Sequence, residues 1–503
     1  MRGSKPFWIF SVYVFCLCLI GMVMYVSILG RSGLSLAGAQ SELTNFFSSL
    51  MALLAGAICV ISPALTGTAI VAERQRQSLD LVLSAPVEPK YLLVGKMISS
   101  YRYTWMLLIL ALPVVAMSVV LGGATWQDVF GCFLLLSFHA LIFTSLALMI
   151  STMTNKPASA VIWSFFAVFA YVIAMTFLSS TALSRAFAGS ASHVPFTIAL
   201  TPFFALQAIN SSTQIGSIDV PNWVFAAVLA LLLTRLFLLG AAVNLAPLDK
   251  RLSANLRLSG LVYTFGLGAL VMYSMAPMFM MMSGSMSAGG MTPSPPGLDP
   301  DLMVLNIGLA SVAWLLFGMP MLSCYGWEGS RRFWPNGIFS LRRALDGTPA
   351  GNLPYLLVLI ASGIGGSLCG NIWAGGTGPK GSLLPGLLWP AGLIVLAWSI
   401  GRLLSAACKA MKTARAFHLC VLILLVGAVP LAMLIFQLSP SWSVDPESHT
   451  SAIWSLWLFT PLLTHDLFKL AWVYGVIMLG IGLLLAFWAQ VLEAKRPRGN
   501  AVA

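Results

Sequence analysis

The charged residues whose spacing is most suggestive of a function lie together, directly after a long apolar run. The stretch from Ala72 to Val87 opens with charged side chains, continues with an apolar stripe and stops at a proline. Its members are Glu73, Arg74 and Arg76, then Leu79, Asp80, Leu81, Val82 and Leu83, then Pro86. This order predicts a short amphipathic helix, because apolar residues recur within it and a proline marks its end. Such a helix lies on a membrane surface or docks against a partner protein.

Signatures of enzymes are missing from the sequence. It contains no HExxH zinc motif, no GxSxG elbow and no GxxxxGK[ST] phosphate loop. We therefore expect this chain to be no enzyme and to bind no cofactor itself. The eight cysteines lie in or beside apolar runs, without the CxxC spacing of a zinc site. A methionine cluster at 272–291 leaves a Cu(I) site open as an alternative to adaptable packing, because thioethers bind Cu(I).

Composition places these residues in a membrane protein. Of the 503 residues, 59% are hydrophobic and only 8% are charged, whereas soluble domains carry roughly 25% charged residues. A helix needs ~20 apolar residues to cross the ~30 Å hydrocarbon core. The runs that qualify are 7–30, 48–72, 104–122, 129–151, 158–180, 222–245, 260–282, 303–323, 354–374, 384–404, 417–437 and 470–492. The predicted fold class is therefore all-α, a polytopic membrane protein with about 12 transmembrane helices.

The basic residues orient these spans. With the N-terminus in the cytoplasm, most Lys and Arg residues fall in cytoplasmic loops, and only Arg31, Arg185, Lys380 and Lys469 fall outside. Basic residues near span ends resist translocation, so we expect both termini in the cytoplasm, and the protein in the inner membrane of a bacterium among membrane lipids. The net charge of +12 follows the same loops, and no nucleic-acid partner is expected. The run at 7–30 exceeds the roughly 7–15 apolar residues of a signal peptide, so we interpret it as a retained span rather than a cleaved leader.

The spans fall into two tandem sets of six. Each of the first six starts 253, 255, 250, 255, 259 or 248 residues before its counterpart in the second set. Both sets have a long cytoplasmic segment after the second span, at 73–103 and at 324–353, and a Thr-Pro pair before the sixth, at Thr201 and Thr460. This predicts two parallel six-helix repeats, 1–250 and 251–503. Chance spacing of apolar runs is the alternative.

Few charged groups lie inside the spans. No Asp or Glu does so, whereas ion-coupled carriers use such carboxylates to load and release a cation. A secondary transporter is therefore disfavoured, and an external energy source is favoured. Arg235 and His139 are candidate intramembrane polar sites. Arg235 either binds an anionic headgroup or substrate, or reaches the interface as a snorkelling side chain, and we favour the second interpretation. His139 is interpreted as a hydrogen-bonding residue between helices, without a functional role.

The charged stretch resembles the cytoplasmic segment of ABC-2-type transporter permeases. Members of that family carry a Glu-Arg-Glu-Arg-Gly-Thr-Leu-Asp string, then Leu-Leu-Ser-Thr-Pro-Val and a Gly-Lys before the third helix. The matching residues are Glu73, Arg74, Arg76, Leu79, Asp80, Ser84, Pro86, Val87, Gly95 and Lys96. Gln77 stands where the family has a glycine, which puts the local backbone in question because glycine adopts conformations that glutamine avoids. The outer stretch from Thr201 to Leu206 is similar to the family's Asn-Pro-Phe-x-Ala-Leu, so the resemblance covers residues 1–245.

The resemblance implies a permease that is driven by a separate ABC ATPase, which binds ATP and Mg. Export is the favoured direction of transport. Two ATPase copies and one copy of this chain are expected, because the chain already contains both six-helix units. The resemblance implies that the ATPase is contacted by Glu73, Arg74, Arg76, Leu79, Asp80, Leu83 and Pro86. The second segment is more degenerate. Glu328, 255 residues after Glu73, is followed by Arg331 and Arg332, and we expect weaker coupling there.

Two other functions stay open. A twelve-helix secondary transporter is supported by the number of spans, and it would lose transport with the ion gradient rather than with ATP. A non-transporting membrane anchor of an extracellular or motility assembly would show no ATP-stimulated flux. The sequence does not identify the substrate, although a core almost free of charge favours a lipid-like, amphiphilic or polymeric cargo.

Overall fold

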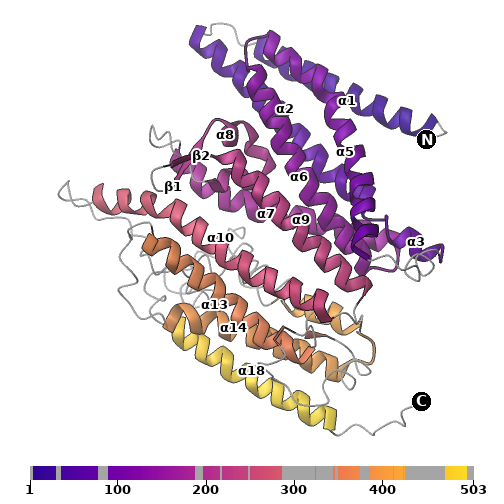
Figure 1. Ribbon diagram of the computed structural model, residues 1–503, viewed down its shortest axis with the longest axis vertical. Coiled ribbons are helices and arrows are strands. Elements are labelled where there is room, and N and C mark those ends of the chain that lie inside the picture. The colour runs from indigo at the N-terminus through magenta and orange to yellow at the C-terminus, as the bar shows by residue number, and fades with distance from the viewer. Residues whose placement is uncertain are drawn as a thin grey trace, which may run out of the picture. The chain divides into compact units, whose positions relative to one another are not determined.

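The computed structural model describes residues 4–29, 36–77, 89–186, 196–215, 218–246, 250–285, 323–324, 344–345, 349–373, 384–411, 413–422, 424 and 471–494. This part of the chain is almost entirely helical, with one small β-hairpin (Figure 1). The chain divides into two compact units, Met1–Leu252 and Ser253–Ala503.

The described part of the first unit consists of six long helices and several short elements. The long helices are α1 (Ser4–Leu29), α2 (Leu36–Thr66), α5 (Pro89–Val120), α6 (Trp126–Met153), α7 (Pro157–Ala186) and α9 (Asn222–Leu245). The short elements are α3 (Val71–Gln75), two 3₁₀ turns η1 (Phe196–Leu200) and η2 (Pro202–Phe204), α8 (Ala205–Ile209), and the antiparallel strands β1 (Ser212–Ile215) and β2 (Ile218–Pro221).

Helix α6 is the central helix of the first unit. It packs against α2, α5, α7, α8 and α9, and a larger share of it is buried than of α2, α5 or α9. Its start is fixed by a capping box, in which Thr125 Oγ1 accepts from the Asp128 backbone N–H at 3.2 Å and Asp128 Oδ2 accepts from the Thr125 N–H at 2.9 Å. Such caps contribute ~1 kcal/mol. A change at either end of α6 therefore reaches most of the helices in this unit.

The segment between α7 and α9 folds back into the first unit. All five residues of η1 are buried. Asn222, also buried, accepts from Thr213 Oγ1 at 2.5 Å and donates to Ser211 Oγ at 2.7 Å, which ties the hairpin to the start of α9. This hairpin was not anticipated by the all-α prediction, because its strands are too short to give an alternating pattern of their own.

The second unit contains α10 (Lys250–Ser285, which begins at the end of the first unit), α13 (Pro349–Trp373), α14 (Leu384–Ala407) and α18 (Ala471–Ala494) among its described helices. Helices α14 and α18 lie side by side (Figure 1). Gly475 of α18 faces the backbone of Leu388 and Trp389. Gly366 and Gly370 of α13 likewise lie against backbone atoms of α10, at Phe265 and Ala269. Small residues allow such close backbone approach between helices in membranes.

Two adjacent glycines of α13 give a matched test of this packing. A Cβ on Gly366 would collide with the backbone of Phe265, whereas a Cβ on Gly365 would meet its nearest neighbour, Phe265 Cε2, at an ordinary 3.8 Å. Alanine gains ~1 kcal/mol over glycine in a helix interior. We expect Gly365→Ala to leave the thermal midpoint unchanged or raised, and Gly366→Ala to lower it by several degrees, measured in detergent by fluorescence. Equal midpoints for the two variants would contradict the close contact of α10 with α13.

Eight helices among the described residues are long and apolar enough to cross a membrane, which confirms a polytopic helical membrane protein. They correspond to the predicted spans 48–72, 104–122, 129–151, 222–245, 260–282, 354–374, 384–404 and 470–492. Shorter apolar helices at Tyr13–Val23, Pro157–Ile173 and Thr413–Leu422 overlap the predicted first, fifth and eleventh spans. Span 303–323 lies, except for Ser323, outside the described residues. The duplication of a six-helix repeat stays a prediction.

Candidate functional site

The first segment, 73–103, begins in α3, and the start of α3 is held by the end of α6. Ser151 Oγ accepts from the backbone N–H groups of Ile70 at 3.1 Å and Val71 at 3.4 Å. The N-cap position of α3 is Ile70, which has no side-chain acceptor. Since the first N–H groups of a helix lack partners within the helix, buried Ser151 supplies the acceptor that an N-cap side chain usually provides.

Arg74 joins α3 to the same end of α6. Its guanidinium donates to the carbonyl oxygens of Thr152 at 3.1 Å and Thr154 at 2.9 Å, and to Asn155 Oδ1 at 2.8 Å. The last carbonyls of a helix lack intrahelical partners and carry partial negative charge, so a cation is favourable there. The planar guanidinium fork can serve several acceptors at once, which an ammonium group does less well. Arg74 is therefore the strongest polar link between α3 and the central helix.

A third link runs from α3 to α5. Glu73 Oε1 and Lys96 Nζ form an ion pair in which both side chains are partly buried, with 23% and 33% of their surface exposed. Both residues belong to the pattern that resembles ABC-2-type permeases, although 23 positions separate them in sequence. The fold brings these two parts of the pattern together. Because both side chains are partly buried, salt screens the attraction between their charges less than it would on a fully exposed pair.

An apolar layer and α9 complete the site. The buried members of this layer are Ile70, Leu93, Met97, Leu148, Ala241 and Ala242. Asn244 of α9 donates from Nδ2 to Thr152 Oγ1 at 3.1 Å. Gly67, in the turn before α3, leaves no room for a side chain, because a Cβ there would lie 2.8 Å from Pro63 O and 3.0 Å from Ser164 Oγ of α7. We define the first joint as four contacts: Ser151 with the start of α3, Arg74 of α3 with the end of α6, Glu73 of α3 with Lys96, and Asn244 of α9 with Thr152 of α6.

Gln77, which stands where the resembling family has a glycine, follows the end of α3. Gln77 has a φ of +56°, the left-handed region that favours glycine. Its N–H donates to Arg74 O at 3.2 Å and closes the helix, as a residue following a helix C-terminus commonly does. The backbone thus keeps the conformation that a glycine suits, although glutamine occupies the position.

This conformation predicts that Gln77→Gly stabilises the protein. A non-glycine residue in the left-handed region costs roughly 1 kcal/mol, so we expect the free energy of unfolding to rise by about 0.5–1 kcal/mol. Gln75→Gly, within α3, should instead destabilise by a similar amount. Thermal midpoints of the two variants in the same detergent test this. A lower midpoint for Gln77→Gly would show that the strain is absent.

The structure brings together some of the predicted coupling residues. Glu73 and Arg74 are engaged within the chain, and Arg76 is exposed. Outside the described residues lie Leu79, Asp80, Leu83 and Pro86 of the first segment and Glu328, Arg331 and Arg332 of the second. The side chains of the methionine cluster beyond Tyr273 are also outside the described part. The predicted docking roles of these residues stay predictions.

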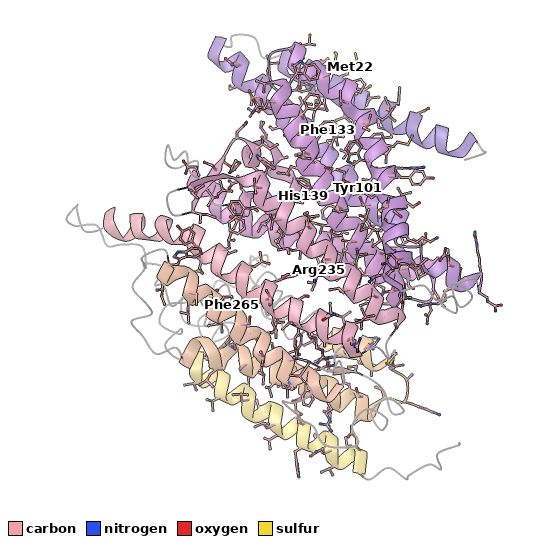
Figure 2. The ribbon with its side chains drawn as sticks, in the orientation of Figure 1. Met22, Tyr101, Phe133, His139, Arg235 and Phe265 are labelled. Carbon is pink, nitrogen blue, oxygen red and sulfur yellow. The ribbon has the colours of Figure 1, made fainter. Side chains whose placement is uncertain are left out.

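The two predicted intramembrane polar residues lie in different surroundings within the first unit (Figure 2). His139 on α6 is 2% exposed, and its Nδ1 lies 3.0 Å from the carbonyl oxygen of Leu135 on the same helix. Arg235 on α9 is exposed. Tyr101 donates from its hydroxyl to Ser137 O at 3.3 Å and links α5 to α6 near His139 in sequence.

Sequence reasoning missed two buried ionisable residues of the second unit. Arg402 lies inside the predicted span 384–404, and His418 inside 417–437, yet neither was singled out. The structure pairs Arg402 with Glu493 at 3.2 Å and buries His418 completely. A single Arg in an otherwise apolar run was the available signal, since such residues are rare in spans and usually paired.

The comparisons with known proteins concern the first unit. Residues 1–245 match the family model described as ABC-2 family transporter protein. No curated protein and no solved structure matches the chain. The matched region runs from α1 to the end of α9 and includes every residue of the first joint.

Proposed function

We propose, from the match of residues 1–245 to the family described as ABC-2 family transporter protein, that the whole chain is the membrane-spanning permease subunit of an ATP-binding-cassette transporter. A separate ATPase, which binds ATP and Mg, drives it. The observation that carries the proposal is the first joint, which lies within the family match and ties the first segment to the central helix.

The proposed mechanism passes from the ATPase through α3 to the bundle. ATP binding closes the two ATPase subunits, and the first segment, docked on one of them, moves with it. Arg74 and Ser151 attach α3 to the end of α6, so this motion shifts or tilts α6. Because α6 packs against four of the long helices of its unit, α2, α5, α7 and α9, the movement is transmitted to the bundle rather than lost in a loop.

We further propose that the chain contains two related units. In the first unit α6 and α9 are parallel: Met149 of α6 lies against Gly240 of α9, and Thr152, further along α6, is bonded by Asn244, further along α9. Residue numbers thus rise in the same direction on both helices. These are the fourth and sixth predicted spans of the first set.

The corresponding pair in the second unit, α14 and α18, is parallel in the same sense. Gly392 lies against Gly475, and Arg402, further along α14, pairs with Glu493, further along α18. These helices are the fourth and sixth predicted spans of the second set. In each set the fourth span packs against the sixth, and this recurrence supports a duplicated six-helix unit. Such a chain would present two coupling segments to two ATPase subunits.

Stoichiometry tests this proposal. We expect native mass spectrometry of the complex with its ATPase, purified through a tag on this chain, to give one copy of the chain and two of the ATPase. Two copies of the chain per complex would overturn the duplicated unit. Failure of every cassette ATPase to co-purify, including any that is encoded beside this chain, would overturn the permease assignment itself.

Export from the cytoplasm is the proposed direction, with both termini in the cytoplasm and the complex in the inner membrane of a bacterium. The cargo is proposed to be lipid-like, amphiphilic or polymeric. Inverted vesicles supplied with ATP outside should then accumulate a labelled cargo, whereas right-side-out vesicles should not. Transport that survives ATP depletion but stops on collapse of the ion gradient would favour a secondary transporter instead.

A further inference from the structure

A polar cluster lies at the end of α14 in the second unit. Ser405, 2% exposed, donates from Oγ to Ser323 O at 3.2 Å and to Gly401 O of its own helix at 2.9 Å. Cys324 Sγ donates to Gly401 O at 3.3 Å, and Arg415 Nε donates to Cys324 O at 3.2 Å. Residues 323 and 324 are therefore held at α14, and they stand where the eighth predicted span ends and the second segment, 324–353, begins.

An ion pair between buried Arg402 and partly exposed Glu493 joins the same end of α14 to α18. Arg402 donates from Nη2 to Glu493 Oε2 at 3.2 Å, and its guanidinium carbon lies 5.6 Å from the centre of the Trp398 ring. The Arg402 side chain is 4% exposed. Removing Glu493 would leave the buried charge of Arg402 without this partner, which is unfavourable, so the link between α14 and α18 is costly to break.

The cluster has the same plan as the first joint. In the first unit a serine at the end of the fourth span, Ser151, accepts a hydrogen bond from the backbone N–H of Ile70, near the end of the second span. In the second unit Ser405 likewise bonds the backbone near the end of the eighth span, but as the donor, to the carbonyl oxygen of Ser323. Ser405 follows Ser151 by 254 residues (405 − 151), and Ser323 follows Ile70 by 253 (323 − 70). Both separations fall within the 248–259 residues that separate the paired predicted spans.

The link between the fourth and sixth spans also recurs. Thr152 is bonded by Asn244 in the first unit, and Arg402 pairs with Glu493 in the second. Arg402 follows Thr152 by 250 residues (402 − 152), and Glu493 follows Asn244 by 249 (493 − 244). Three polar side chains and one backbone position thus recur within about one helical turn, given 3.6 residues per turn.

We propose that Ser405, Arg402, Glu493 and the backbone at 323–324 form a second joint, which attaches the second segment to α14 and α18 and passes ATPase motion into the second unit. This rests on the proposed permease function. The proposal changes the expectation of weaker coupling in the second half. The docking pattern around Glu328 is degenerate, but the attachment inside the bundle is retained. An ion pair there replaces the neutral hydrogen bond of the first joint. Ser405 is a positioning residue in this proposal.

The test uses the full chain with its ATPase in lipid nanodiscs. Ser405→Ala removes the hydroxyl, Ser405→Thr keeps it, and Ser399→Ala is the matched control. Ser399 is fully buried on the same helix and donates to Val395 of that helix at 2.7 Å. We expect Ser405→Ala to lower the permease-stimulated ATP turnover about 3–10-fold, consistent with one buried hydrogen bond. Ser405→Thr should restore most of the turnover, Ser399→Ala should not change it, and the amount of bound ATPase should be equal throughout.

Three results would overturn the proposal, and they are distinguishable. If Ser151→Ala lowers turnover but Ser405→Ala behaves like Ser399→Ala, the first joint works alone and the permease function stands. If Ser405→Ala lowers the thermal midpoint and ATPase binding, while turnover per bound ATPase is unchanged, the cluster serves folding only. If the unmodified chain neither binds nor stimulates a cassette ATPase, the permease function fails and the second joint with it.

Discussion

Arg74→Ala is expected to reduce permease-stimulated ATP turnover at least tenfold while the protein still inserts and binds its ATPase. The substitution removes three hydrogen bonds from a charged donor to the end of α6. Bonds to charged groups contribute ~1.5–3 kcal/mol each, and about 1.4 kcal/mol corresponds to a factor of ten in an equilibrium. Without Arg74, α3 can move without moving α6, so the ATPase would close without shifting the bundle. ATP turnover and ATPase binding, measured on the same nanodisc sample, check this.

Two control variants separate geometry from charge at this position. Arg74→Lys keeps the positive charge but loses the planar fork, so its turnover should lie between those of Arg74→Ala and the unmodified chain. Gln75→Ala alters the exposed neighbour in α3 and should have no effect. If Arg74→Ala retains full turnover, then Ser151 and the apolar layer alone hold α3, and the guanidinium is dispensable for coupling.

The long helices were predictable because an uncharged run of sufficient length has few other stable conformations in a bilayer. The residues at which these helices begin and end were less predictable. Helix α5 begins at Pro89, 15 residues before the predicted span at 104. Its first turns carry Lys90, Lys96 and Arg102, which hydropathy excludes from a span although nothing prevents them from being helical. Hydropathy detects the membrane-crossing part of a helix, and the remainder depends on packing against other elements.

The site was predictable only in part, for a related reason. Glu73, Arg74 and Lys96 were identified because a family pattern contains them. Ser151, which bonds the start of α3, and Asn244, which bonds Thr152 of α6, are ordinary helix residues about 80 and 170 positions from α3, and no local pattern marks them as members of the site. Their role follows from which helix ends meet in the folded chain, and only the tertiary structure gives that.

Glu73 distinguishes a docking role from an anchoring role. The family resemblance predicts that Glu73 contacts the ATPase, with Leu79 as an apolar anchor, so that Glu73→Lys combined with Leu79→Asp should abolish stimulated turnover. The structure pairs Glu73 with Lys96 of α5 instead. We expect Glu73→Lys alone to lose most of the stimulated turnover, because it places two lysines together beside Arg74.

The charge-swapped protein decides between the two roles. If the pair within the chain is what matters, adding Lys96→Glu to Glu73→Lys restores an ion pair between α3 and α5. Turnover should then recover to within about threefold of the unmodified chain, because residues in contact are energetically coupled. If Glu73 contacts the ATPase, the swap leaves a lysine facing that surface and turnover stays lost. The same charge change at Glu328 should have a smaller effect, because the second segment has lost most of the docking pattern. Equal losses at Glu73 and Glu328 would show that both segments dock alike, and that the second joint serves an intact coupling segment.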